Sequence, residues 1–266
     1  MQVSRHVQRL SFAAGAVSSG GRVLPEEVAV ALSFNGTTQA VMMATPHDLI
    51  DFAYGFAMTE GIALADEVEA VEVVELANGI DVQVWLQPQA EVRLTNRRRT
   101  MAGPVGCGLC GIDSLDEALR KVRGVPKSSF IMGPAEVMQA VAALPGAQPL
   151  HDATRAVHAA GFWAGGLVAV REDVGRHNAL DKLAGHLIRQ PAAIGAVVLT
   201  SRVSIDMVQK VAALGAPMLI AVSAPTAHAV TLADEAGITL IALAKADRFE
   251  VFTHSERLIP ETAHVA

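Results

Sequence analysis

From residue 155 onward, short apolar runs alternate with amphipathic segments, and this rhythm constrains the fold more than any other feature of the chain. The amphipathic segments predict helices at 175–189, 204–215 and 226–237. The apolar runs between them predict strands at 156–164, 166–173, 193–201, 217–224, 238–243 and 248–253. Apolar strands that alternate with helices are typical of a layered α/β domain whose sheet is covered on both faces.

The first half of the chain has a different pattern, in which hairpin signals dominate. Asn35-Gly36 and Asn78-Gly79 each separate two strand-like runs, because both residue types tolerate the positive φ of a tight turn. A helix is expected at 47–60, after Thr45-Pro46. Two more are expected at 114–122 and 134–144, around a joint rich in Gly, Pro and Ser.

These patterns predict three parts of the chain. Residues 1–25 are expected to form a flexible leader, and residues 26–125 a smaller hairpin-rich α+β lobe that ends in a cysteine loop. Residues 126–266 are expected to form a C-terminal α/β domain that binds a cofactor.

Composition excludes several classes of protein. The chain is 51% hydrophobic, which suffices for a large core, and its net charge of −6 argues against a nucleic-acid binder. It has no apolar run of about 18 residues that would predict a transmembrane helix. Two cysteines do not make a disulfide framework, so we expect a cytoplasmic protein with reduced thiols.

Both cysteines, Cys107 and Cys110, lie in the glycine-rich stretch "GPVGCGLCGID". One interpretation is half of a zinc site, although no second ligand pair stands at a clear spacing. Another is a thioredoxin-like redox pair, which normally opens a helix after a strand. A third is a mobile nucleophile that carries sulfur as a persulfide, since glycines place no Cβ against either partner. Three arginines precede the loop and either lower the thiol pKa or form a solvated surface run.

Polar and basic residues follow three of the predicted strands. Arg176 and His177 open a helix directly after the strand that ends at Asp173. Two further strand ends carry hydroxyl or basic side chains: Thr200, Ser201, Arg202, Ser204, Ser223 and Thr226. Ligands of open α/β sheets lie at the carboxyl ends of strands, where helix N-termini favour anions. The pattern therefore predicts a site for a phosphorylated ligand of dinucleotide type.

Several of these residues also have a purely structural interpretation. Ser204 and Thr226 stand where helix N-caps are expected. His158 lies in a predicted buried strand, and is either a core residue or part of the site. Asp173 is expected to orient a histidine, bind a ligand hydroxyl or pair with a nearby arginine.

Long segments of the chain resemble the formate dehydrogenase accessory sulfurtransferase family, FdhD. The resemblance rests on "EDVGRHNALDKL", "GCGLCG" and "SRVSIDMVQKVAALGAPMLIAVSAPTA", together with the segment 26–62, and it spans roughly residues 25–254.

The resemblance implies a function. Members take sulfur from a cysteine desulfurase and pass it to the bis-molybdopterin guanine dinucleotide molybdenum cofactor, bound as a substrate that GDP-like ligands mimic, for the formate dehydrogenase catalytic subunit. It implies that Cys107 bears the persulfide with Cys110 as its partner, that the C-terminal domain has a fold similar to cytidine deaminase, and that the protein is a homodimer. It also implies a cofactor-binding segment of Leu243, Ala244, Lys245, Ala246, Asp247 and Arg248.

The sequence also allows two alternatives to sulfur transfer to be compared with it: zinc-dependent deamination and cofactor binding without sulfur chemistry. A zinc deaminase needs an H-x-E motif followed by P-C-x-x-C, whereas here "HAA" follows the cysteines and lacks the glutamate. A cofactor-binding chaperone without sulfur chemistry would keep the phosphate site and have dispensable cysteines. No metal ligands are predicted.

Overall fold

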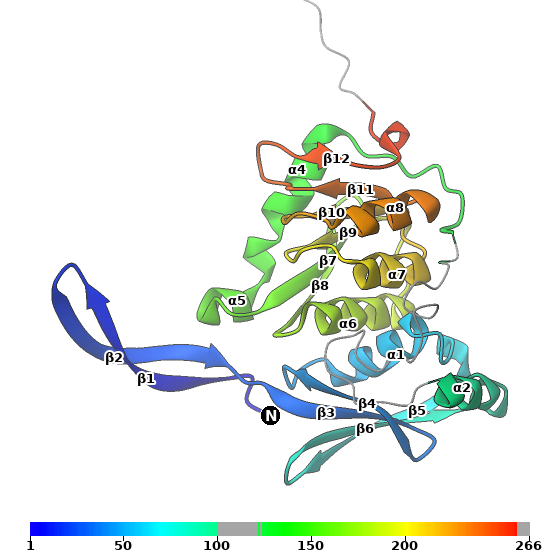
Figure 1. Ribbon diagram of the computed structural model, residues 1–266, viewed down its shortest axis with the longest axis horizontal. Helices are drawn as coiled ribbons and strands as arrows, with labels where there is room; N and C mark the ends of the chain where they lie inside the picture. The colour runs from blue at the N-terminus through cyan, green and yellow to red at the C-terminus, as the bar shows by residue number, and fades with distance from the viewer. Residues whose placement is uncertain (101–121, 123, 260–266) are drawn as a thin grey trace, which may run out of the picture.

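The computed structural model describes residues 1–100, 122 and 124–259, which form two sheets, their covering helices and a projecting hairpin (Figure 1). The predicted helix at 114–122 and both cysteines lie outside these residues. Among the described helices, none is long and apolar enough to cross a membrane.

The N-terminal lobe is built on a four-stranded sheet of β3 (Val28–Phe34), β4 (Thr37–Ala44), β5 (Val68–Leu76) and β6 (Gly79–Leu86), in the order β4-β3-β6-β5. Alternation along β3 places Val30, Leu32 and Phe34 on the inner face, where each is fully buried. Helix α1 (Leu49–Thr59) packs on this face. Both predicted hairpins are confirmed, with positive φ at Gly36 and Gly79.

Two local features of this lobe differ from expectation. Helix α1 begins at Leu49 because Asp48 adopts a left-handed conformation, φ 53°, that ends the preceding turn. Helix α2 (Pro88–Thr100) was not predicted, because its sequence lacks a regular apolar stripe. A short 3-10 helix, η1 (Ala65–Glu67), leads into β5.

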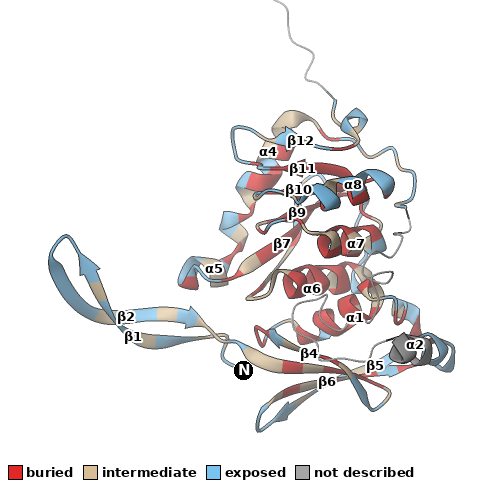
Figure 2. Ribbon diagram, viewed as in Figure 1, coloured by how far each residue is buried: buried red, intermediate tan, exposed pale blue. Residues whose placement is uncertain are grey.

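The second sheet has the order β12-β11-β10-β9-β7-β8. Its strands are β7 (His158–Trp163), β8 (Leu167–Asp173), β9 (Ala196–Leu199), β10 (Met218–Ala221), β11 (Thr239–Ala242) and β12 (Glu250–Val251). Helices α6 (Arg176–Arg189), α7 (Ile205–Leu214) and α8 (Ala227–Glu235) cover one face. Helix α4 (Pro134–Ala143) covers the other. The predicted α/β layering is therefore confirmed, and red, buried ribbon fills the middle of the stack in Figure 2.

Shorter elements join these layers. Helix α5 (Pro149–Thr154) follows α4 through the 3-10 helix η2 (Pro145–Ala147), and η3 (Ser255–Arg257) follows β12. These segments carried no period long enough to be predicted from sequence.

The expectation of a flexible leader at residues 1–25 is wrong. Strands β1 (Ser4–Ala13) and β2 (Ala16–Pro25) pair along their whole length, from Ser4 opposite Pro25 to Ala13 opposite Ala16. The serines and glycines of β2 have low strand propensity, and only their pairing with β1 makes them a strand. We call this hairpin the arm; Figure 1 shows it projecting from the base of β3.

The two lobes meet where α1 crosses α6, and two glycines allow the contact. A Cβ atom added at Gly55 would lie 1.7 Å from the carbonyl oxygen of Asp181. A Cβ atom at Gly185 would lie 1.8 Å from the carbonyl oxygen of Asp51. The backbones of the two helices therefore touch directly at this crossing.

We expect Gly185→Ala to destabilise the protein by about 3 kcal/mol, because a methyl group would force the two helix backbones apart. The measurement is the free energy of unfolding in urea. Gly146→Ala is the matched control, since a Cβ there has no neighbour within 4 Å. A Gly185→Ala protein as stable as this control would show that the helices separate at little cost.

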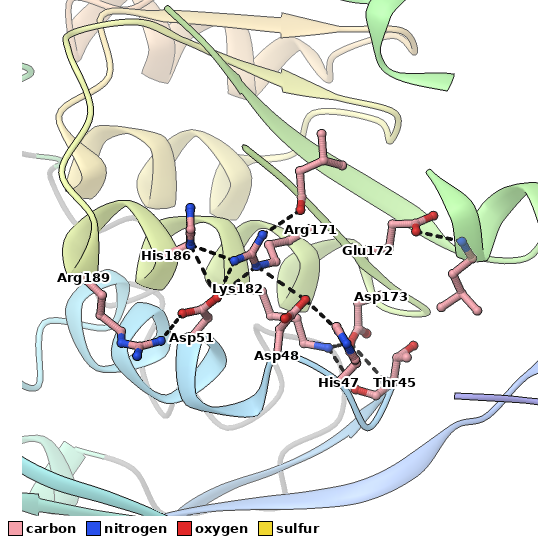
Figure 3. Close-up of polar contacts among 12 residues, drawn as sticks. Thr45, His47, Asp48, Asp51, Arg171, Glu172, Asp173, Lys182, His186 and Arg189 are labelled. Atoms are coloured by element: carbon pink, nitrogen blue, oxygen red, sulfur yellow. Dashed lines mark hydrogen bonds and ion pairs between the residues drawn. The ribbon is translucent and has the colours of Figure 1, made fainter. Parts of the chain in front are cut away.

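Ion pairs reinforce the same crossing. Asp51 accepts hydrogen bonds from Arg171 at 2.7 Å and Arg189 at 2.6 Å, and Arg171 also contacts His186 (Figure 3). Further along, Lys210 Nζ lies 2.9 Å from both Asp181 Oδ1 and Glu60 Oε1. Burial would lower the pKa of Lys210, but the two carboxylates outweigh burial and raise it. Charged groups from α1, β8, α6 and α7 therefore join the lobes.

Candidate functional site

The strand register brings most of the predicted binding residues to one edge of the second sheet. Strands β8 and β9 both run antiparallel to β7, so they run parallel to each other and to β10 and β11. Their carboxyl ends therefore all lie on the same side of the sheet. We call the loops and helix N-termini at these strand ends the strand-end site. His158, the first residue of β7, lies opposite Asp173 and so belongs to the same edge.

Backbone hydrogen bonds join the loops of this edge. Val203 N–H donates to Ala224 O, and Thr226 N–H donates to Val203 O. Leu243 N–H donates to Ser223 O at 3.3 Å, and Lys245 N–H to Arg248 O at 2.7 Å. The loops after β9, β10 and β11 thus hold one another in position, which suits a preorganised binding surface.

The first turn of α6 contributes the strongest sign of a ligand. Arg176 is the first residue of that helix, and its N-cap, Gly175, provides no capping side chain. The Nε atom of Arg176 is buried without a hydrogen-bond partner among the described residues. Buried guanidinium donors are normally paired, so this Nε–H is available as a donor to an anionic ligand.

Ser204 shows the same feature one strand along. It is the N-cap of α7, yet its hydroxyl forms no capping bond, and its Oγ is buried without a partner among the described residues. Thr226, by contrast, caps α8 by accepting from Ala229 N–H at 3.2 Å. A side chain that caps a helix therefore explains Thr226 but does not explain Ser204.

His177 does not add positive charge to the site. Its Nε2 contacts the Asp206 carboxylate. Burial lowers the pKa of His177 to about 4, with Asp206 opposing. At neutral pH the imidazole is uncharged and its Nε2–H donates to Asp206, so Arg176 alone supplies the cation of this turn.

His158 is half-buried beside Arg176. Burial, reinforced by the Arg176 guanidinium, lowers the pKa of His158. A neutral imidazole at this edge is suited to hydrogen bonding rather than to charge neutralisation.

Asp173 is fully buried and has a structural role. Its carboxylate accepts from Lys182 Nζ at 2.6 Å and Thr45 N–H at 3.0 Å (Figure 3), and from Asn178 Nδ2 at 2.9 Å and Gly175 N–H at 2.7 Å. Four donors occupy both oxygens, so Asp173 holds the turn that leads into Arg176 instead of facing a ligand. Asp173 forms no ion pair with Arg171 or Arg176, the two arginines that lie near it in the sequence.

The remaining predicted residues differ in exposure. Ser201 is buried and donates to Arg202 O at 3.1 Å, whereas Arg202 is exposed. Thr200 bonds the backbone of Ala159. In the segment 243–248, Ala244 is buried in the core beneath the sheet, while the exposed members are Leu243, Lys245, Ala246, Asp247 and Arg248.

Sequence reasoning missed the buried polar residues that support the site. They are Thr45, Asn178, Asp181, Lys182, Asp206 and Lys210. A signal was present, because Asn178 and Lys182, like Asp206 and Lys210, are four residues apart on amphipathic helices. Among the described residues, no group of three His, Asp or Glu side chains could hold a metal ion.

Comparison with protein families decides what kind of protein this is. The model of the FdhD/NarQ family matches residues 25–259. The chain belongs to the FdhD/NarQ family.

Close relatives and a solved structure agree with the FdhD/NarQ assignment. A protein named sulfur carrier protein FdhD from Agrobacterium fabrum is 53% identical, over 96% of each chain. Its namesake from Brucella abortus is 50% identical, over 97% of this chain and 98% of its own. A crystal structure assigned as a formate dehydrogenase accessory protein, from Desulfotalea psychrophila, matches with a TM-score of 0.78 and 26% identity, covering 97% of this chain and all of its own. None of these tests the expected similarity to cytidine deaminase, which stays a prediction.

Proposed function

We propose that this protein is a sulfur carrier for the maturation of formate dehydrogenase, with Cys107 holding the sulfur as a persulfide. The observation that carries the proposal is the full-length similarity to proteins named sulfur carrier protein FdhD. The cysteine loop supports it, because Cys107 and Cys110 are the only thiols in the chain and glycines flank both.

The donor in this proposal is a cysteine desulfurase. The Cys107 thiolate attacks the terminal sulfur of the desulfurase persulfide, a new S–S bond forms to Cys107, and the desulfurase thiolate leaves. The sulfane sulfur keeps its oxidation state in this exchange, so acceptance of sulfur needs no further oxidant or reductant.

The acceptor in this proposal is the bis-molybdopterin guanine dinucleotide molybdenum cofactor, bound as a substrate at the strand-end site. Arg176 Nε and Ser204 Oγ, both buried without a partner among the described residues, fit its phosphates, as do the N-termini of α6 and α7. The other proposed contacts are His158, His177, Ser201, Arg202, Ser223, Thr226 and the exposed members of the segment 243–248. We also propose that the protein is a homodimer in the cytoplasm and that its partner is the catalytic subunit of formate dehydrogenase.

The experiment that tests sulfur carriage is peptide mapping. The purified protein is incubated with a cysteine desulfurase and cysteine, and the peptide that contains Cys107 is analysed by mass spectrometry without reduction. We expect a mass increase of one sulfur on Cys107. An unmodified peptide from a protein that still binds GDP would favour a cofactor-binding chaperone instead.

Arg176→Ala should weaken GDP binding about tenfold or more, since hydrogen bonds to charged groups typically contribute about 1.5–3 kcal/mol. Isothermal titration calorimetry measures the dissociation constant. Lys127→Ala is the control, because Lys127 is exposed in the irregular segment that follows Val125, whose N–H donates to Ala236 O just before β11, on the side of the sheet opposite the strands' carboxyl ends. Equal affinity in both variants would place the nucleotide elsewhere.

A further inference from the structure

The arm has two unlike faces, which follow from its register. Residues directly opposite each other in an antiparallel pair point to the same face. One face carries Arg5, Arg9 and Arg22, and the other carries Leu10, Phe12 and Val17 near the turn. These three apolar side chains are 63%, 75% and 60% exposed. We call the outer end of the arm the tip, and these side chains make one of its faces an exposed apolar surface.

The described residues leave the tip uncovered. Residues 12–19 are all exposed, and an isolated two-stranded hairpin is at best marginally stable in water. Figures 1 and 2 show the arm extending away from both sheets, with its exposed end far from the body. A partner that buries Leu10 and Phe12 would explain why this segment keeps strand-forming apolar residues at its exposed end.

A pocket of about 450 Å³ lies at the base of the same arm. Val3, Leu150, Ala153 and Val170 supply apolar wall. The polar part of the lining includes Asp48 and Glu172, together with Arg171, which pairs with Asp48. A cavity of about 150 Å³ accepts a benzene ring, so this pocket has room for Phe12 and a neighbouring side chain. It lies between the arm, α5, β8 and the turn before α1.

The pocket cannot receive the tip of its own arm. Ten residues at about 3.3 Å each place the tip roughly 30 Å from the base, and continuous pairing keeps the hairpin extended. The tip of a second copy reaches the pocket when two arms lie side by side in opposite directions. Each tip then meets the other copy's base, which is the reciprocal geometry of a two-fold dimer.

Charge favours a second copy as the occupant. Residues 1–25 contain three arginines and no carboxylate, whereas the whole chain has a net charge of −6. Arg5 is paired with Glu26, but Arg9 and Arg22 form no ion pair with a described residue. The acidic body of another copy therefore complements the arm, and complementary charge directs encounter and register.

We propose that the arm is the dimerisation element of this protein, with Phe12 and Leu10 of each copy inserted into the pocket at the base of the other copy's arm. This inference rests on the homodimer included in the proposed function. It is independent of sulfur transfer, which persulfide mapping of Cys107 measures separately.

Cross-linking tests the contact directly. In full-length protein with Cys107→Ser and Cys110→Ser, one sample carries Phe12→Cys and the other Ala153→Cys. After mixing, subunit exchange and mild oxidation, we expect a covalent one-to-one heterodimer, because a disulfide forms only when the Cα atoms are within about 7 Å. Phe12→Cys mixed with Ile194→Cys is the control, since Ile194 is 59% exposed but lies outside the pocket. Absence of the heterodimer, or equal yield in the control, would overturn the proposal.

The mass in solution provides a second test. Light scattering should give twice 27.8 kDa for the wild-type protein and 27.8 kDa for a Leu10→Asp/Phe12→Asp variant. Val41→Asp/Met43→Asp is the matched control, because both residues are 51% exposed on the outer face of the four-stranded sheet. We expect this control to stay dimeric.

The outcomes separate the interface from the homodimer itself. If the wild-type protein has the mass of a monomer, both the homodimer and the arm interface are overturned. A dimer that survives the arm substitutions, or one that is lost in the sheet-face control instead, would overturn the arm interface and leave the homodimer standing.

Discussion

Cys107→Ala should reduce formate dehydrogenase activation to the level of cells that lack the protein. In our proposal the Cys107 thiolate holds the transferred sulfur, and alanine has no nucleophile to replace it. Activity is measured in cells whose own copy has been deleted and replaced by the variant. GDP affinity should be unchanged, because the strand-end site is formed by side chains of β7, α6 and the loops after β9, β10 and β11.

Cys110→Ala is the matched control, since it removes the other thiol of the same loop. We expect the Cys107 persulfide still to form in this variant, whatever its effect on later steps. Normal activation by Cys107→Ala would exclude Cys107 as the residue that carries the sulfur. Loss of GDP binding in the same variant would instead mean that the substitution disturbs the fold.

Asp173→Ala should destabilise the protein by about 3–5 kcal/mol. The substitution leaves the ammonium group of Lys182, which is fully buried, without its carboxylate partner at 2.6 Å. Removal of one member of a buried ion pair typically has this cost, because the other charge stays desolvated. It also leaves the backbone N–H groups of Thr45 and Gly175 without an acceptor.

The free energy of unfolding in urea measures this loss. Asp152→Ala is the control, because Asp152 is in an exposed ion pair with Arg155 and should change stability by less than about 1 kcal/mol. Combining Asp173→Ala with Lys182→Met should cost less than the sum of the two single substitutions, by about 0.5–3 kcal/mol. Strict additivity would show that the two groups do not interact.

Much of the second domain was predictable because its signals are local. Each strand of the second sheet lies within a segment predicted as a strand, and α6, α7 and α8 follow an amphipathic period. The clustering of Arg176, Ser204 and Ser223 was also predictable, since they follow strands whose carboxyl ends share one side of the sheet. The arm was not predictable, because Gly20 and Gly21 have strand geometry only through their pairing with Arg9 and Gln8.

The roles of individual polar residues depended on distant partners. Asp173 and Arg176 looked equally available for a ligand, yet Thr45, 128 residues away in the sequence, and Lys182 occupy Asp173 completely. Arg176 keeps a buried Nε without a described partner. His177 was expected to add positive charge to the site, but Asp206, from the next helix, contacts its Nε2 and the imidazole stays neutral.

The sequence by itself determined the layered α/β class, the family and the side of the sheet where we propose that a ligand binds, because hydrophobic periodicity and motif order act over a few residues. Only the tertiary structure decided that Asp173 is a buried anchor, that Gly55 and Gly185 let two helices touch, and that residues 1–25 form an arm. Each of these depends on which distant atoms are brought within about 3 Å, and hydrogen bonding and steric exclusion act only at that range.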